Sequence, residues 1–235
     1  MMNKLRVLDL FSGIGGFSLG LERTGGFETV AFCEIEEFPR KVLAKHWPDV
    51  PILENVKYVG RQTVKGPIDV ICGGFPCQPF STASAGRRVA RDWWPEMREA
   101  IGHFMPQFVI AENTAELPIK RALVELRKFG YGGITKRIGA HEAGADHQRN
   151  RWWLCAYTDH QGELHSAINA EVEKLPQLCG GVWGAENYAR TIRVSNGIPN
   201  RVDRNKCLGN AVLPQIPEAI GRAILATYDK KEGST

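Results

Sequence analysis

Residues 68–81 read Ile-Asp-Val-Ile-Cys-Gly-Gly-Phe-Pro-Cys-Gln-Pro-Phe-Ser, a short apolar run that breaks at a pair of glycines. Such a run is typical of a strand that is buried on both faces of a parallel sheet. Gly73 and Gly74 let the backbone approach a ligand without interference from Cβ atoms, and Pro76 fixes the backbone just before Cys77. Because open α/β sheets bind ligands at the carboxyl ends of their strands, this pattern favours a functional site at Cys77. The alternative is that Cys77 is a small buried apolar residue, as free cysteines often are.

Strand-like and helix-like segments alternate from residue 5 to about residue 130, which predicts a doubly wound α/β fold with a mostly parallel sheet. Strands are expected at residues 5–10, 29–33, 50–53, 68–72 and 108–112, and helices at residues 17–26, 37–46, 94–104 and 119–129. Residues 131–138 and 151–157 are expected to form an antiparallel closing pair.

The periodicity weakens after residue 157 and returns near the C-terminus. Residues 158–208 carry many turn signals, which predicts a small irregular lobe. Residues 209–228 recover helical spacing and are expected to form a helix that packs back on the sheet. We therefore expect a main domain over residues 1–157, the lobe, and this last helix.

Composition narrows the class of protein. The 235 residues are 43% hydrophobic and 24% charged, which is ordinary for a soluble globular chain. No apolar run approaches the ~20 residues that span a bilayer, and residues 1–7 lack the features of a signal peptide, so a cytoplasmic protein is expected. The six cysteines form no C-x-x-C pair, which argues against a zinc site and against a disulfide framework. The net charge of +4 is compatible with nucleic acid binding but does not require it.

Residues 9–22, Asp-Leu-Phe-Ser-Gly-Ile-Gly-Gly-Phe-Ser-Leu-Gly-Leu-Glu, place a glycine-rich turn between an expected strand and an expected helix, as in cofactor-binding loops. The spacing departs from G-x-G-x-x-G because Ser18 occupies the third glycine position, which weakens a dinucleotide interpretation. Glu34 ends the next expected strand, where a carboxylate can accept hydrogen bonds from both hydroxyls of a ribose. A tight turn followed by a solvated glutamate is the alternative.

Three further motifs follow along the chain: Glu112-Asn113-Thr114, the segment His-Gln-Arg-Asn-Arg at residues 147–151, and Gly-Asn-Ala-Val at residues 209–212. Arg149 and Arg151 lie two residues apart, so their side chains share one face if the segment is a strand. Each motif also has a structural explanation, namely a helix-capping carboxylate, a pair of surface arginines and a helix N-cap. Two histidines lie near the second motif, but no third ligand has a spacing that suits a metal.

In this order the motifs resemble the DNA cytosine-C5 methyltransferase family, particularly its compact, phage-type members, over about residues 5–226. The resemblance implies a Rossmann-like class I methyltransferase fold with one antiparallel strand, in which residues 158–208 form a target-recognition lobe. It also implies that S-adenosylmethionine is the cofactor. The residues implied for binding it are Asp9, Phe11, Ser12, Gly13, Ile14, Gly15, Gly16, Glu34, Ile35, Asn55, Val56, Gly74, Pro76, Asn210 and Ala211.

The resemblance further implies four catalytic residues. Cys77 is the nucleophile that attacks C6 of a cytosine taken out of duplex DNA. Glu112 holds N3 and the exocyclic amine of the base, and Arg149 and Arg151 face the base carbonyl and the nucleophile. The residues implied to contact DNA are Gln78, Ser81, Arg87, Arg88, Trp183, Arg190 and Arg193.

Three positions depart from the family pattern: Asn55 stands where an acidic residue is common, Thr114 replaces a valine, and His147 replaces a glutamine. We expect a monomer that needs no metal or membrane, with double-stranded DNA and a cognate restriction enzyme as partners. Methylation of cytosine in transfer RNA is an alternative, as is a DNA-binding homologue without catalysis. A nicotinamide or flavin oxidoreductase is a weaker alternative.

Overall fold

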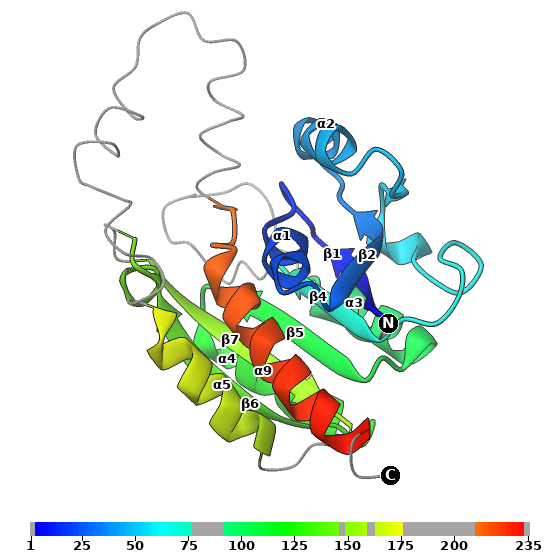
Figure 1. Ribbon diagram of the computed structural model, residues 1–235. Coiled ribbons are helices and arrows are strands. Elements are labelled where there is room, and N and C mark those ends of the chain that lie inside the picture. The colour runs from blue at the N-terminus through cyan, green and yellow to red at the C-terminus, as the bar shows by residue number, and fades with distance from the viewer. Residues whose placement is uncertain (1–2, 77–91, 146–148, 159–162, 176–209, 233–235) are drawn as a thin grey trace, which may run out of the picture.

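The computed structural model describes residues 3–76, 92–145, 149–158, 163–175 and 210–232. Within these residues seven strands form one sheet in the order β3-β2-β1-β4-β5-β7-β6 (Figure 1). The strands are β1 (Leu5–Leu10), β2 (Phe27–Cys33), β3 (Ile52–Leu53), β4 (Val70–Gly74), β5 (Phe108–Asn113), β6 (Gly132–Gly139) and β7 (Asn150–Tyr157).

The direction of the strands confirms the expected fold class. The strands from β3 to β5 pair in parallel. Strand β7 runs antiparallel to both of its neighbours, β5 and β6. From β1 the chain first builds outward to β3 and then returns to β4 on the other side of β1. This reversal places a crevice at the carboxyl ends of β1 and β4, where doubly wound folds bind ligands.

Helices cover both faces of the sheet (Figure 1). On one face, α1 (Gly16–Arg23), α5 (Glu163–Glu173) and α9 (Gln215–Glu232) share a core with residues such as Val7 and Val70. On the other face, α3 (Trp94–Phe104) and α4 (Glu116–Arg127) pack on Leu8 and Ile71. The remaining helices are α2 (Glu37–His46) and the short 3₁₀ turns η1 (Val56–Tyr58) and η2 (His141–Ala143). No helix in the described part of the chain is both long enough and apolar enough to span a bilayer.

The two glycines that end β4 have different neighbours. A Cβ atom on Gly73 would lie 2.4 Å from the carbonyl oxygen of Leu10, so a side chain there would push β4 away from β1. The expectation that both glycines serve a ligand was therefore wrong for Gly73, which allows the two strands to pack closely. Gly74 instead faces the carboxylate of Glu112.

A last helix was expected at residues 209–228 and is present as α9 (Gln215–Glu232), whereas α5 was not expected. In α9 the residues with helical spacing, from Ile216 to Thr227, are buried against the sheet side of the molecule. Helix α5 lies within residues 158–208, for which we expected irregular structure. Its buried residues Leu164, Ile168 and Val172 recur every four positions among polar neighbours, so its apolar stripe is narrow. Such a stripe is enough here because α5 packs directly against α9.

Candidate active site

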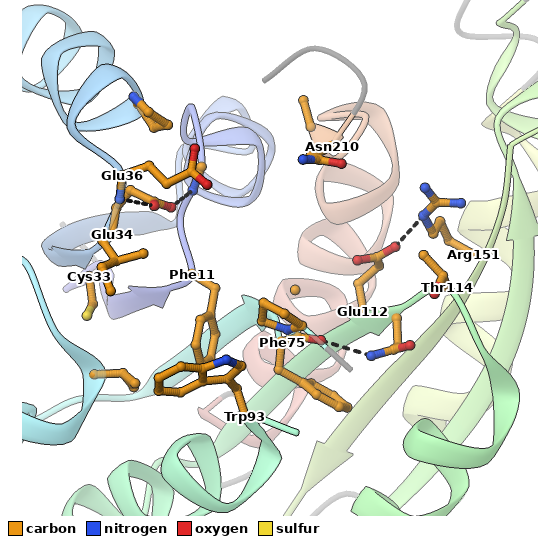
Figure 2. A pocket seen from close by; sticks show the side chains of 18 of the residues that line it. Phe11, Cys33, Glu34, Glu36, Phe75, Trp93, Glu112, Thr114, Arg151 and Asn210 are labelled. Carbon is orange, nitrogen blue, oxygen red and sulfur yellow. Dashed lines mark hydrogen bonds and ion pairs between the residues drawn. The ribbon is translucent and has the colours of Figure 1, made fainter. Parts of the chain in front are cut away.

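A cavity of about 530 Å³ lies at the carboxyl ends of β1, β2, β4 and β5. Figure 2 shows Cys33 and Glu34 at one end, Glu112 and Arg151 at the other, and Phe11 and Trp93 between them. Of the residues expected to bind a cofactor, those that line the cavity are Phe11, Gly13, Glu34, Ile35, Asn55, Val56, Gly74, Pro76, Asn210 and Ala211. Glu112, Arg149 and Arg151 line the same space.

The other expected cofactor residues lie in or next to the glycine turn but do not line the cavity. Asp9, Ser12, Ile14, Gly15 and Gly16 are not among the described residues that line the cavity. The buried hydroxyl of Ser12 donates to the Asp9 carbonyl at 2.7 Å and accepts from the Cys33 backbone N–H at 3.2 Å, which ties β1 to β2. Gly15 has a φ of 86°, a conformation that favours glycine.

Ser18 explains how the turn works without a third glycine. The Asp9 carboxylate is fully buried, and its Oδ2 accepts hydrogen bonds from the Ser18 hydroxyl at 2.7 Å and from the Ser18 backbone N–H at 3.3 Å. Burial raises the pKa of Asp9 to about 7, although these hydrogen bonds lower it. Asp9 and Ser18 therefore join β1 to the first turn of α1 through a buried polar contact.

Glu34 holds the turn against β2. Its Oε2 accepts a hydrogen bond from the Gly13 backbone N–H at 2.7 Å, and its Oε1 accepts one from the Glu36 backbone N–H at 2.8 Å. A carboxylate has about four lone-pair sites, so each oxygen keeps the capacity to accept a further hydrogen bond from a ligand hydroxyl. Glu34 lines the cavity in this fixed orientation.

Aromatic residues form the middle of the cavity. Phe11 adopts a φ of 52°, a conformation that is uncommon for residues other than glycine and is often found at functional sites. Its ring meets the Trp93 ring edge-on, with the centroids 6.5 Å apart. Our sequence analysis did not single out Trp93. The one sequence feature that could have indicated Trp93 is its position directly before the expected helix at 94–104. That feature was not sufficient, because aromatic residues at such positions also occur in ordinary hydrophobic cores.

Asn55 lies just after β3 and caps the turn that follows. Its side-chain Oδ1 accepts a hydrogen bond from the Lys57 backbone N–H at 3.0 Å and so caps η1. Val56, which follows it, is buried and lines the cavity. The side-chain amide oxygen of Asn55 is therefore already used to cap η1.

Glu112 and Arg151 form an ion pair at the far end of the cavity. The Arg151 Nε atom lies 2.8 Å from Glu112 Oε1 (Figure 2). The pairing of β5 with β7 brings the two residues together, because Glu112 stands opposite Trp153, two residues along β7 from Arg151. Strand residues two apart share a face, so the arginine points to the same side of the sheet as the carboxylate.

Burial gives this carboxyl an unusual acidity. Burial raises the pKa of Glu112 to about 7, and the positive charges of Arg151 and then Arg149 oppose the rise. A carboxyl group with such a pKa is available in both protonation states near neutral pH. It can therefore donate a hydrogen bond or accept one from a bound base.

Arg149 bridges to the C-terminal segment. It precedes β7, and its Nη1 donates a hydrogen bond to the carbonyl oxygen of Ala211. Burial and the neighbouring Arg151 lower the pKa of Arg149, and Glu112 opposes this shift. The bridge places Asn210 and Ala211 on the cavity wall beside the ion pair.

Asn113 fixes the backbone at the end of β4. Its Nδ2 donates to the carbonyl oxygen of Phe75 at 2.9 Å, and its Oδ1 accepts from the Ala115 backbone N–H at 3.0 Å. The Trp93 backbone N–H donates to the Pro76 carbonyl at 3.1 Å. The two residues just before Cys77 are therefore held by Asn113 and Trp93.

Several predicted site residues lie outside the described residues. They are Cys77, Gln78, Ser81, Arg87, Arg88, His147, Trp183, Arg190 and Arg193. Their predicted roles stay predictions. Among the described residues no cluster of His, Cys, Asp or Glu suits a metal ion.

Comparison with known proteins identifies the family. Residues 5–193 match the model of the C-5 cytosine-specific DNA methylases. The type II methyltransferase M.AplI of Arthrospira platensis is 33% identical over 165 residues, which cover 67% of this chain and 47% of the relative. The chain thus spans about half the length, or less, of the curated relatives that it matches.

Solved structures support the fold. A chain encoded within an Escherichia coli prophage and described as a DNA modification methyltransferase has a TM-score of 0.63 at 17% identity, covering 96% of this chain and 100% of that one. The DNMT2 of Spodoptera frugiperda has a TM-score of 0.58 at 19% identity, covering 68% of this chain and 51% of that one. The family model matches well over half of the chain, which shows that the chain belongs to the C-5 cytosine-specific DNA methylase family.

Proposed function

We propose that this chain transfers a methyl group from S-adenosylmethionine to C5 of cytosine in duplex DNA, through a covalent bond between Cys77 and C6 of a flipped base. The observation that carries the proposal is the pair of the buried Glu112 with the half-buried Arg151, which lies in the same cavity as the Gly13–Glu34 turn. A single space thus offers groups suited to a nucleoside cofactor at one end and groups suited to a pyrimidine at the other.

The described residues fit the cofactor. A cavity of about 530 Å³ lies within the range of ligand sites in proteins. Phe11, Val56 and Trp93 offer apolar contact to a flat ring, and Glu34 offers carboxylate oxygens to ribose hydroxyls. When bound, S-adenosylmethionine supplies an electrophilic methyl group.

The chemistry requires the base to leave the helix, because attack at C6 needs the face of a ring that is stacked in a duplex. The Cys77 thiolate forms a bond to C6, and the ring electrons move towards N3. Glu112 in its protonated form donates a hydrogen bond to N3, where charge builds up. Arg151 holds the Glu112 carboxyl in place and lies on the side of the base carbonyl.

The addition would make C5 nucleophilic, so that C5 could take the methyl group while the bond between that carbon and the cofactor sulfur breaks and S-adenosylhomocysteine leaves. Loss of the C5 proton to solvent and departure of the Cys77 thiolate would then restore the double bond between C5 and C6. The products would be 5-methylcytosine, S-adenosylhomocysteine and a proton, with Cys77 free again as a thiolate. On this proposal Cys77 returns to its starting state after each turnover.

We assign DNA contacts to Gln78, Ser81, Arg87 and Arg88 near the nucleophile. We assign sequence recognition to the stretch that contains Trp183, Arg190 and Arg193. Because α5 packs against α9, the recognition lobe in this proposal begins after α5 rather than at residue 158. A cognate restriction enzyme and a monomeric state remain predictions.

The test uses duplex DNA that contains 5-fluorocytosine, together with S-adenosylmethionine. The fluorine atom replaces the proton that must leave C5, so the covalent complex should persist in denaturing gels. We expect a stable complex with the wild type and with Cys155→Ser, whose thiol is buried with its pKa raised to about 12, and none with Cys77→Ser. Absence of the complex with folded wild-type protein would refute the proposal.

A parallel reaction separates the alternative substrates. Labelled S-adenosylmethionine is supplied with either unmodified duplex DNA or transfer RNA. We expect label at C5 of cytosine in the DNA. Label in transfer RNA alone would support RNA methylation, and DNA binding without label in either substrate would support a homologue that lacks catalysis.

A further inference from the structure

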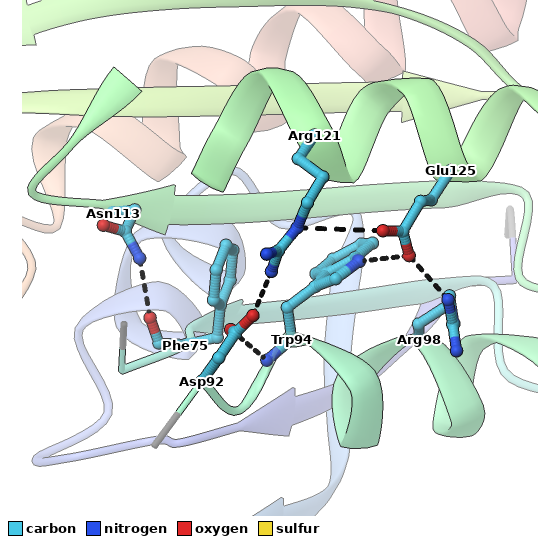
Figure 3. Close-up of polar contacts among 7 residues, drawn as sticks. All are labelled: Phe75, Asp92, Trp94, Arg98, Asn113, Arg121 and Glu125. Carbon is cyan, nitrogen blue, oxygen red and sulfur yellow. Dashed lines mark hydrogen bonds and ion pairs between the residues drawn. The ribbon is translucent and has the colours of Figure 1, made fainter. Parts of the chain in front are cut away.

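Trp93, in the middle of the cavity, is flanked by two residues that are both held by α4. Asp92 precedes it and Trp94 follows it, and Figure 3 shows their contacts with Arg121 and Glu125 of α4. The Asp92 Oδ2 atom accepts a hydrogen bond from Arg121 Nη2. The Trp94 indole Nε1 donates to Glu125 Oε2 at 2.9 Å.

The two contacts hold different segments of the chain, and Arg121 links them because its Nε atom also lies 3.7 Å from Glu125 Oε1 (Figure 3). Trp94 is fully buried, its ring packs on that of Phe75 at 5.3 Å, and Arg98 also donates to Glu125 at 2.6 Å. These contacts join α3 to α4 on the core side. The Asp92–Arg121 pair lies outside α3 and holds the segment that leads into it.

Asp92 also sets the direction in which α3 begins. Its Oδ1 accepts a hydrogen bond from the Trp94 backbone N–H at 3.0 Å. One carboxylate oxygen thus bonds to Arg121 of α4, and the other bonds to the residue that follows Trp93. On the far side the Trp93 backbone N–H donates to the Pro76 carbonyl at 3.1 Å. The backbone around Trp93 is therefore fixed from two directions.

The Asp92–Arg121 ion pair is partly exposed to solvent, which limits its contribution to stability. The side chains of Arg121 and Asp92 are 45% and 30% exposed. Ion pairs at such exposure contribute little to global stability. A role for this pair is therefore expected to appear in the placement of Trp93 rather than in the stability of the fold.

We propose that Arg121 is a positioning residue that, through Asp92, holds the Trp93 indole beside Phe11 as part of the cavity wall against which a flat heteroaromatic ring binds. That this ring is the adenine of S-adenosylmethionine rests on the proposed function. The placement of Trp93 by Arg121 does not depend on that assignment.

The first experiment examines the protein without ligand. Full-length protein is labelled with 5-fluorotryptophan, and the ¹⁹F NMR signal of Trp93 is identified by its loss in Trp93→Phe. We expect Arg121→Gln to shift or broaden this signal and Arg121→Lys to leave it near the wild-type position. The matched control is Lys120→Gln, which removes an exposed ion pair with Glu116 (2.7 Å) from the same helix and should leave the signal unchanged. An unchanged Trp93 signal in Arg121→Gln would overturn the inference.

The second experiment measures binding of S-adenosylhomocysteine by calorimetry. We expect Arg121→Gln to bind about fivefold more weakly, which corresponds to about 1 kcal/mol, with Arg121→Lys in between and Lys120→Gln like the wild type. The thermal midpoints of Arg121→Gln and Lys120→Gln should fall by similar amounts. Equal affinities for wild type and Arg121→Gln would refute the link to the ligand. If the wild type itself does not bind, the proposed cofactor is wrong, and the NMR result still decides the placement of Trp93.

Discussion

Replacing Asp9 with asparagine should make the stability of the protein less sensitive to pH. Asp9 is fully buried, and its pKa in the folded protein is raised to about 7 from a usual value of 3.8. The folded state therefore keeps a proton on Asp9 between about pH 4 and pH 7, while the unfolded chain releases it. Since the unfolded state then binds fewer protons, the free energy of unfolding falls as pH rises through this window.

The size of the effect follows from the size of the shift. Each pKa unit corresponds to about 1.4 kcal/mol, so a shift of about three units amounts to roughly 4 kcal/mol as an upper bound. Asparagine has no proton to lose, so Asp9→Asn should gain up to this amount relative to the wild type between pH 4 and pH 8. The Asp9 Oδ1 atom is buried without a hydrogen-bond partner among the described residues, so an amide NH₂ placed there adds a cost. That cost does not vary with pH and leaves the trend intact.

The assay is chemical denaturation of both proteins at several pH values from 4 to 8, compared as a difference in the free energy of unfolding. Ser18→Ala provides a second variant, because it removes a hydrogen bond that favours the charged carboxylate. It should destabilise the protein more at pH 8 than at pH 5. The control is Asp69→Asn, the same change at a half-buried carboxylate that accepts from the Arg6 backbone N–H at 2.8 Å. A flat difference between Asp9→Asn and the wild type, or one of opposite slope, would refute the reasoning.

Two further predictions concern the surroundings of the cavity. A Cβ on Gly16 would lie 2.5 Å from the Val212 carbonyl oxygen, so Gly16→Ala should lower the free energy of unfolding by about 1–3 kcal/mol in denaturant titrations. Gly102→Ala is its control, because a Cβ there meets nothing within 4 Å inside α3 and should stabilise by up to about 1 kcal/mol; equal effects of the two changes would contradict the steric argument. Arg151→Met removes the charge that most opposes the effect of burial on Glu112, so the pKa of Glu112 should rise above about 7 in a ¹³C NMR titration of its carboxyl. A lower pKa in that variant would show that the pair does not act as described.

The elements predicted correctly from the sequence are those whose local hydrophobic pattern matches the way in which they pack in the fold. Helices α2 and α3 begin and end at the expected residues, and β1 spans the expected run. The antiparallel placement of β7 was also predicted and is confirmed. The residues of the Glu112–Arg151 pair came from motifs, whereas their contact depends on strand register, which a motif alone does not give.

What sequence analysis missed depends on partners that are distant in the chain. In the sequence, Ser18 was only a departure from the glycine motif. In the structure, its hydroxyl donates a hydrogen bond to the buried carboxylate of Asp9, nine residues earlier. Gly73 looked like a ligand-facing glycine, but a neighbouring strand requires it. Asp92, next to Trp93, accepts a hydrogen bond from Arg121 of α4, and α5 packs against a helix that begins about fifty residues later.

The close fit of Gly16 against Val212 has a consequence for synthesis on the ribosome. The glycine turn is made early, but Asn210 and Ala211, which complete the wall beside it, directly precede α9, the last described helix. A nascent chain whose α9 is still within the ribosome exit tunnel lacks this part of the cavity wall. Binding of a ligand in the cavity should therefore wait until α9 has been made and has left the ribosome.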